Sequence, residues 1–329
     1  MPGLFVLIDF ALAYASLSRD GRAFLRKQRS RKKNGRTPES VELLRNRPSR
    51  LSLIHSLKTC DAVFADSFPG SVCAASGRRK SSLYPRFVPF AWISLEIWMR
   101  LLAAYGISPG EDDVRLLILL TFVHREWNDL VDEVPPEILY RGLRSADPPE
   151  PRFKLLGHLT ALTNALAERK GRFGKLFQVW QKSMEFYSRP FKPGEAASHL
   201  EGKAALNEEL YSTALLPEVP PKLAETLRLF YVWFLALDDA SDVERDRARG
   251  RSTYMTLAAD PMGEIRRFFR QCEEVVRRTS PRDPGQLLLL MRSMTADVAA
   301  AIRQGGDIEG DFYAAPDKPV NRISNPSNP

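Results

Sequence analysis

The spacing of apolar residues along the chain changes at about residue 88. From there to about residue 304, apolar residues recur every three or four positions, which is the period of an α-helix with one buried face. Clusters rich in Pro and Gly, such as SADPPEP (145–151), separate these stretches, and none alternates as a β-strand would. The pattern predicts an all-α fold, a compact bundle of about 8–10 helices, eight of which we place at 88–105, 111–134, 150–170, 172–188, 194–215, 220–249, 261–279 and 284–304.

Charge separates the N-terminal quarter from the rest of the chain. Residues 1–81 contain 16 Lys and Arg against 6 Asp and Glu, a balance of +10, whereas residues 82–329 contain 32 against 34, a balance of −2. The helical part therefore gives no reason to expect specific nucleic-acid binding. We expect a basic, poorly ordered extension over 1–82 with one short helix near 38–46, an all-α domain over 83–310, and a disordered tail over 311–329.

Cysteine spacing and the first apolar run bear on the compartment. Cys60, Cys73 and Cys272 show no CxxC spacing, which disfavours a disulfide framework or a zinc site. The apolar run at 4–16 is too short to span a membrane, and no basic residues precede it as in a signal peptide. We expect a cytoplasmic protein; a transit segment and a peripheral membrane contact are the alternatives for its basic N-terminal part.

Four aspartates follow the most apolar stretch of the chain. Nine consecutive apolar residues, Leu229 to Leu237, predict a helix buried on all sides. At about 100° per residue, the aspartates that follow fall within one arc of about 100°; we call them the 238–246 cluster (Asp238, Asp239, Asp242 and Asp246). Like charges this close repel each other, and a hard cation such as Mg²⁺ would neutralise them. The alternative is a solvated helix end paired with Arg245, Arg247 and Arg249.

A second acidic group also follows an apolar run, Leu116 to Val123. We call it the 129–133 cluster (Asp129, Asp132 and Glu133), whose members share one side of the predicted helix 111–134. Taken alone, it is more typical of an acidic turn at the surface. Because both clusters extend a buried helix, we predict that they face each other across one cavity.

The residues around the 238–246 cluster carry a family resemblance. Asp238-Asp239-Ala240-Ser241-Asp242 is followed by Glu244 and Asp246, by Arg249-Gly250-Arg251 and by Thr253. This order resembles the second acidic motif of the class I isoprenoid synthases, in their polyprenyl and squalene/phytoene branches. Their first motif, DDxxD, is matched by Asn128-Asp129-Leu130-Val131-Asp132, in which Asn128 replaces an aspartate. The resemblance covers about residues 88–305; the double-Arg element of chain-elongating synthases is absent, which leaves a terpene cyclase or a squalene/phytoene-like condensing enzyme.

The resemblance implies an enzyme that ionises a prenyl diphosphate with Mg²⁺ and then cyclises or condenses it, as a terpene synthase or prenyltransferase. Three Mg²⁺ ions would bind Asp129, Asp132, Glu133, Asp238, Asp239 and Asp242, of which all but Glu133 also count as catalytic. The diphosphate would meet cationic side chains, for which the candidates are Arg189, Lys192, Lys203, Arg245 and Arg251. An aromatic pocket would guide the carbocation, with Phe122, Trp127, Phe186, Tyr187, Tyr211, Phe230, Trp233 and Phe234 as candidates. A homodimer is compatible with this family.

Two other classes of protein remain open from the sequence. A non-catalytic helical scaffold would keep the fold and use its basic arm to contact nucleic acid or membrane. A di-iron carboxylate bundle would also place acids inward, but it needs paired Glu-x-x-His elements. The nearest match, Glu195 to His199, has the wrong spacing.

Overall fold

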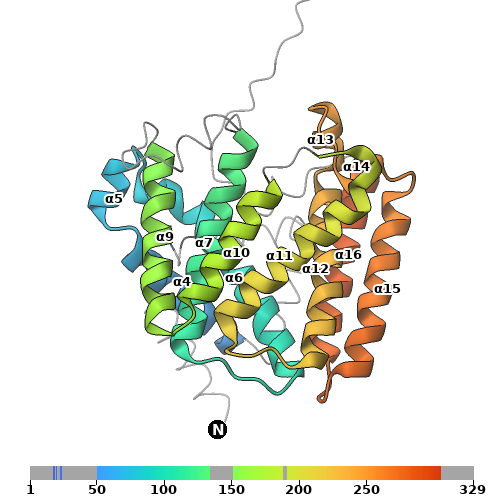
Figure 1. The fold of residues 1–329 in the computed structure, drawn as a ribbon, viewed down its shortest axis with the longest axis horizontal. Coiled ribbons are helices and arrows are strands. Elements are labelled where there is room, and N and C mark those ends of the chain that lie inside the picture. Colours follow the sequence, from blue (N-terminus) through green and yellow to red (C-terminus); the bar gives the residue numbers. More distant parts are fainter. Residues whose placement is uncertain are drawn as a thin grey trace, which may run out of the picture.

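The structure, a computed structural model, describes residues 50–133, 151–187 and 191–304, together with the isolated positions 18, 20 and 23. These parts of the chain form a bundle of helices (Figure 1) and contain no strand. The predicted all-α fold is therefore confirmed for this portion. It holds twelve α-helices and one 3₁₀ turn, more than the 8–10 helices expected.

The helices of the first half are α4 (Arg50–Ser67), α5 (Gly70–Ala75), α6 (Lys80–Ala104), α7 (Glu111–Glu133), α9 (Pro151–Arg169) and α10 (Phe173–Tyr187). Those of the second half are η1 (Pro193–Glu195), α11 (Ala196–Leu215), α12 (Pro221–Ser241), α13 (Val243–Ala248), α14 (Tyr254–Leu257), α15 (Pro261–Thr279) and α16 (Gly285–Gln304).

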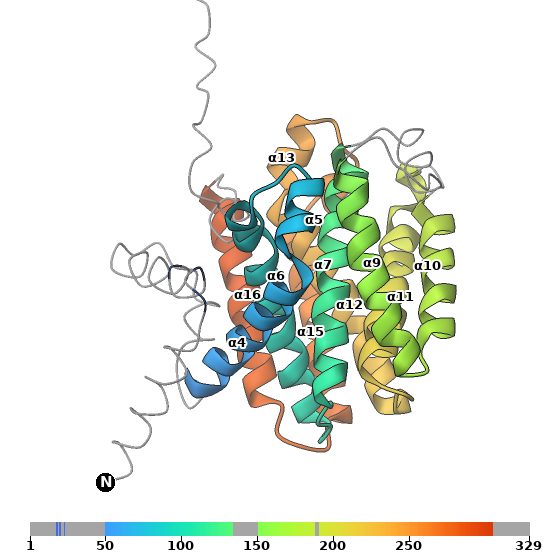
Figure 2. The ribbon, with the colours of Figure 1, turned by 90° about the vertical axis from the view of Figure 1, so that its left-hand side faces the viewer.

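Four helices, α6, α7, α11 and α12, form the middle of the bundle, each packed against the next. Helices α9 and α10 cover α7 and α11 on one side, and α15 and α16 cover α12 on the other (Figure 1). Helices α4 and α5 lie along the side made by α6, α7 and α9 (Figure 2). Helix α12 is therefore surrounded, which agrees with its uninterrupted apolar stretch Leu229 to Leu237.

Helix α4 and the turn after it, which fall within the expected N-terminal extension 1–82, belong to the core of the bundle. Side chains of α4 and of the turn after it are fully buried in the core, among them Leu57, Cys60, Phe64 and Phe68. They recur at helical spacing, but the basic average of residues 1–81 hides this apolar stripe. The predicted helix near 38–46 and the tail 311–329 lie outside the described residues.

Two further helix boundaries differ from the prediction. Helix α6 begins at Lys80 rather than 88 and contains Pro85 and Pro89, residues that normally argue against a helix interior. The predicted helix 220–249 is broken at Asp242, where φ is −108° and ψ is 2°. Just before the break, the Ser241 hydroxyl donates to the Asp238 carbonyl oxygen at 2.7 Å, and such side-chain bonds to the preceding turn bend helices.

Helix α6 also meets the length and apolarity of a membrane-spanning segment, as the single such helix in the described part of the chain. Of its most apolar stretch, 67% is buried inside the bundle. That burial is typical of a core helix, so α6 by itself gives weak evidence for a membrane span.

Candidate functional site

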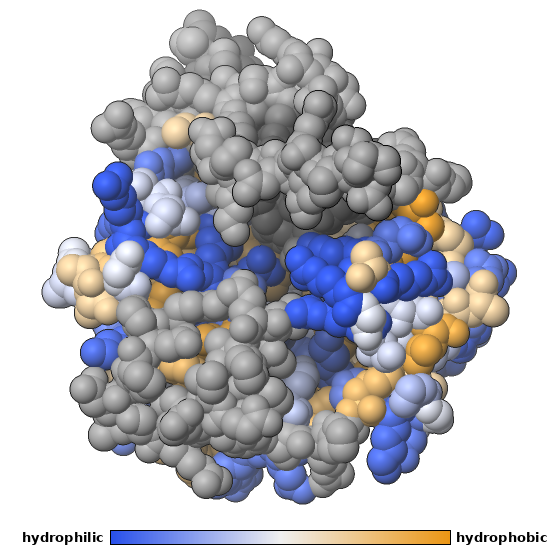
Figure 3. Space-filling model, turned by 90° about the horizontal axis from the view of Figure 1, so that it is seen from above, coloured by the Kyte–Doolittle hydropathy of each residue, from blue (hydrophilic) through white to orange (hydrophobic). Residues whose placement is uncertain are grey.

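A cavity of about 860 Å³ lies among α6, α7, α11 and α12. Its mouth is at the end of the bundle where α12 gives way to α13, and Figure 3, viewed onto this end, shows hydrophilic residues gathered there. Each of these helices contributes side chains one turn apart, because residues i and i+4 share a helix face. On α11 the series from the mouth inward is His199, Lys203, Asn207 and Tyr211; on α12 it is Asp242, Asp238, Phe234 and Phe230.

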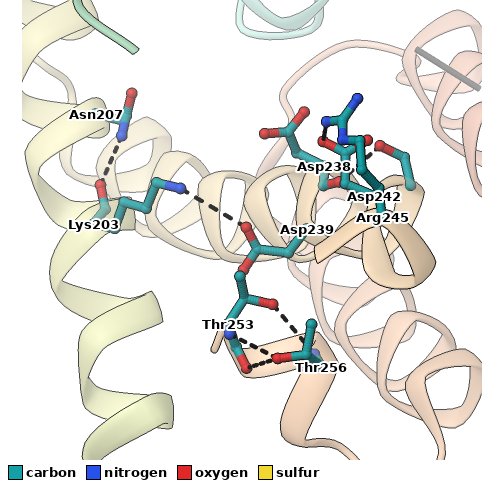
Figure 4. A network of polar contacts seen from close by, with 9 residues as sticks. Lys203, Asn207, Asp238, Asp239, Asp242, Arg245, Thr253 and Thr256 are labelled. Carbon is teal, nitrogen blue, oxygen red and sulfur yellow. Dashed lines mark hydrogen bonds and ion pairs between the residues drawn. The ribbon is translucent and has the colours of Figure 1, made fainter. Parts of the chain in front are cut away.

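The 238–246 cluster lines the mouth with all four of its aspartates. Asp238 is exposed, Asp239 is half-buried with its carboxylate 3.8 Å from the Lys203 ammonium, and Asp242 forms an ion pair with Arg245 (Figure 4). Burial raises the pKa of the Asp239 carboxyl above its ordinary value; Lys203 opposes this rise and Asp246 adds to it. The cluster is therefore crowded with negative charge, although cations from α11 and α13 offset part of it.

The opposite wall carries Asp129, so the predicted meeting of the two clusters at one cavity is confirmed for this residue. Its carboxylate forms ion pairs with Arg86 of α6 and, at 3.7 Å, with Arg125. Arg86 also binds Glu126, which is fully buried, at 2.8 Å. Two guanidinium groups therefore balance Asp129. No local pattern indicated Arg86, which lies 43 positions away on another helix. The side chains of the other two members of the 129–133 cluster lie outside the described residues.

Three of the five predicted diphosphate-binding cations line the cavity: Lys203, Arg245 and Arg251. Lys192 does not, because it precedes η1 in an exposed turn and pairs with Glu195 at 3.3 Å. Arg189 lies outside the described residues. The structure adds a cation that the prediction did not include, Arg249, from the end of α13.

Thr253 of the family-like motif has a local structural role. Its side chain accepts a hydrogen bond from the Thr256 backbone at 3.2 Å, while the Thr256 hydroxyl accepts one from the Thr253 backbone at 2.7 Å (Figure 4). This reciprocal cap fixes the start of α14, and it holds Arg251 to Tyr254 along the mouth of the cavity.

Aromatic rings form the floor of the cavity. Tyr187, Tyr211, Phe230 and Phe234 line it as predicted, and Trp98 and Tyr231 join them. The rings of Trp98, Tyr211 and Tyr231 touch one another, with centroid distances of 6.0 to 6.3 Å. The sequence did not single out Trp98 or Tyr231, because each is one of many apolar residues on a helix buried on several sides.

Four predicted pocket aromatics lie elsewhere. Phe122 packs against Phe64, Phe68 and Phe87 in the core, because two positions on a helix place it about 200° from His124, which faces the cavity. Trp233 is fully buried toward α16, where its indole donates to the Thr295 hydroxyl at 3.3 Å.

The remaining two misplaced aromatics lie at the α10 and α7 edges of the cavity. Trp127 lines a separate small cavity of about 20 Å³. Phe186 packs against α11 at Gly202, where an added Cβ atom would come within 2.6 Å of its ring. Periodicity marked all four side chains as buried, but it does not tell which neighbour each one faces.

No family model, curated protein or solved structure matches this chain.

A histidine and a tyrosine form a polar pair at the floor. His124 Nδ1 lies 2.8 Å from the Tyr211 hydroxyl, and the two rings stack at 5.8 Å. Burial, with Lys203 and Arg125 adding to its effect, lowers the pKa of His124 to about 4. The imidazole is therefore neutral at physiological pH. Tyr211 was predicted as an aromatic residue of the pocket, whereas His124 was not predicted as a site residue.

Proposed function

We propose that this protein is a Mg²⁺-dependent enzyme that ionises a prenyl diphosphate and then cyclises or condenses the resulting chain. The observation that carries the proposal is the polarity of one cavity of about 860 Å³, with acids and cations at the mouth and aromatic rings at the floor. A prenyl diphosphate has the same division, a charged head and a long apolar tail. The cavity therefore suits this substrate in one orientation, with the head at the mouth.

The mouth has the groups that bind and release a diphosphate. Lys203, Arg249 and Arg251 line it together with the 238–246 cluster. Arginine and lysine form charge-assisted hydrogen bonds with phosphate oxygens, and they stabilise charge that develops on a leaving group. We therefore assign these three side chains to holding the diphosphate and stabilising it as the carbon–oxygen bond breaks.

The donor set at the mouth fits magnesium. Asp238 and Asp239 lie in the last turn of α12, where the helix dipole already disfavours negative charge, so a bound cation relieves two repulsions at once. Among the described residues, no three His, Cys, Asp or Glu side chains form a ready-made metal site. Mg²⁺ commonly takes only one or two protein carboxylates and completes its shell with water and phosphate oxygens. When bound, it would supply Lewis acidity toward the diphosphate.

The two acidic clusters contribute differently to this proposal. Asp238, Asp239 and Asp242 remain the proposed metal ligands on α12. Asp129 is paired with two arginines, so a metal ion there would compete with both guanidinium groups. We therefore place the main metal-binding contribution on α12, and we regard the α7 wall as a weaker contributor.

The floor of the cavity provides the second half of the chemistry. The faces of Tyr211, Tyr231 and Trp98 carry negative electrostatic potential, which favours a carbocation that forms after the diphosphate leaves. Phe230 and Phe234 above them supply apolar wall. Such a lining guides an unsaturated chain and limits the access of water to it.

The test is release of inorganic diphosphate from farnesyl and geranylgeranyl diphosphate, with Mg²⁺ and with excess chelator. We expect Mg²⁺-dependent release together with an organic product that extracts into hexane. The matched control is Asp66→Asn, at an exposed surface ion pair outside the cavity, which should behave as the parent. A folded parent that releases no diphosphate from either substrate would contradict the proposal and would favour a non-catalytic helical scaffold.

A further inference from the structure

The pair His124 and Tyr211 is a polar feature of the cavity to which diphosphate release assigns no proton transfer. Both residues line the floor, on α7 and α11. His124 is one turn deeper along α7 than Asn128, a rise of about 6 Å, so it lies below the level of the charged mouth. Its ring neighbour there is Tyr211 of the aromatic floor, where the proposed carbocation would be held after it has moved away from the diphosphate, and Lys203 and Arg125 are the charged groups that act on it.

The hydrogen bond between the two side chains bears on which nitrogen of His124 can accept a proton. His124 Nδ1 lies 2.8 Å from the Tyr211 hydroxyl. In the tautomer that carries its proton on Nδ1, this N–H donates to the Tyr211 oxygen and Nε2 is left as a proton acceptor.

We propose that His124 is the base that ends the reaction, and that the product is a hydrocarbon rather than an alcohol. This inference rests on the proposed function. The C–H bond next to the cationic carbon breaks, its electron pair forms the new C=C bond, and the proton goes to Nε2 of His124. The imidazolium then returns the proton to solvent or to the released diphosphate.

The surroundings of His124 keep its ring unprotonated and fix its orientation. Because its pKa is lowered to about 4, the ring is unprotonated in the resting protein at physiological pH. A weak base is sufficient, because a carbocation is a far stronger acid than an imidazolium ion. Tyr211 holds the ring by stacking and by its hydrogen bond, so the acceptor nitrogen has a fixed direction.

The experiment measures the ratio of hydrocarbon product to total diphosphate released, with farnesyl and geranylgeranyl diphosphate and Mg²⁺. We expect hydrocarbon to dominate in the parent and the ratio to fall by about tenfold or more in His124→Phe, with alcohols in its place. Tyr211→Phe, which keeps the ring but removes the acceptor for Nδ1–H, should lower the ratio in the same direction. Circular dichroism melting verifies that each variant is folded.

His199→Phe is the matched control, because His199 lines the same cavity at the mouth, between Phe186 and Phe191. It should keep the product ratio of the parent. An unchanged ratio in both His124→Phe and Tyr211→Phe would overturn the inference, as would a parent that makes only alcohols. In either case Mg²⁺-dependent diphosphate release would still stand. Absence of that release in the parent would instead refute the proposed function, and this inference with it.

Discussion

Replacing Asp239 by asparagine distinguishes two roles of the 238–246 cluster, binding of a cation and a purely structural role. The substitution keeps the shape of the side chain but removes one negative charge, which lies 3.8 Å from Lys203 and is repelled by Asp246. If the cluster binds a cation, the variant loses ligand affinity without losing its fold. If the cluster is held together only by its own ion pairs, the variant loses stability and nothing else changes.

The expected size of the ligand effect follows from mass action. Mg²⁺ with pyrophosphate at about 100 times its dissociation constant stabilises the parent by about 2.7 kcal/mol. For a folded region of this size, about 1 kcal/mol moves the melting temperature by about 2–4 °C, so the parent should shift by about 5–10 °C. Loss of an outer-shell partner already costs about 10–100-fold in metal affinity, so we expect loss of a ligand to weaken binding about 100-fold. The remaining stabilisation in the variant is then about 0.4 kcal/mol, or roughly 1 °C.

Without ligand, we expect Asp239→Asn to change the melting temperature in a definite direction. Since burial raises the pKa of Asp239 above its ordinary value of 3.8, ionising this group costs folding free energy. The Asp239 carboxyl therefore contributes its full stabilisation to the folded state below the pKa that it has in the unfolded chain. This stabilisation is lost as the pH rises through the pKa that it has in the folded state. At pH 7, Asp239→Asn should melt at or above the parent temperature, and this difference should disappear near pH 3.

The assay is a set of melting curves for parent, Asp239→Asn and the exposed control Asp66→Asn, each with and without Mg²⁺ plus pyrophosphate. Asp66→Asn should shift as the parent does, because surface ion pairs contribute only about 0–1 kcal/mol. The reasoning fails if Asp239→Asn keeps the full ligand shift. It also fails if that variant is clearly destabilised at pH 7 while the parent shows no ligand shift.

Three further predictions concern the fold around the site. Arg86→Met leaves the buried Glu126 carboxylate without its guanidinium, so it should lower the free energy of unfolding, measured in urea, by about 3–5 kcal/mol. The double variant with Glu126→Met should recover this loss in full, and no loss in the single variant would contradict the prediction. Phe64→Ala should cost about 3–5 kcal/mol by the same measurement, because Phe64 is buried in the core; a loss below about 1 kcal/mol would mean that α4 is not part of the folding unit. Burial raises the pKa of Glu96, so Glu96→Gln should gain stability relative to the parent as the pH rises from about 4 to 7. A stability difference between variant and parent that does not depend on pH would contradict burial of Glu96 as the cause.

Much of the fold was accessible from the sequence because helical periodicity is a local property. The bounds of α7, α9, α11, α15 and α16 fall within two residues of the ranges predicted from apolar spacing and from Pro and Gly clusters. Errors arose where local signals conflicted with packing. The start of α6 was missed because Pro85 and Pro89 argue against a helix interior. The apolar stripe of α4 was missed because the net charge of residues 1–81 as a whole is basic.

The candidate site was predictable on α12 and only partly elsewhere. Asp238, Asp239 and Asp242 were visible because charge interrupts a long apolar run. Arg86 and Trp98 were not, because their importance depends on which helix lies beside α6, and this is a long-range property that no local pattern encodes. The same limit explains why the predicted aromatics were divided between cavity and core.

The close approach of Phe186 to Gly202 has a consequence for sequence variation. A Cβ atom at position 202 would come within 2.6 Å of the Phe186 ring, so any larger residue there must move either the ring or the helix axis. Chains that share this architecture should therefore show the two positions changing together, with a side chain at 202 accompanied by a smaller residue at 186. Such covariation would report on the α10–α11 contact in relatives whose acidic motifs have diverged, since it depends on shape and not on chemistry.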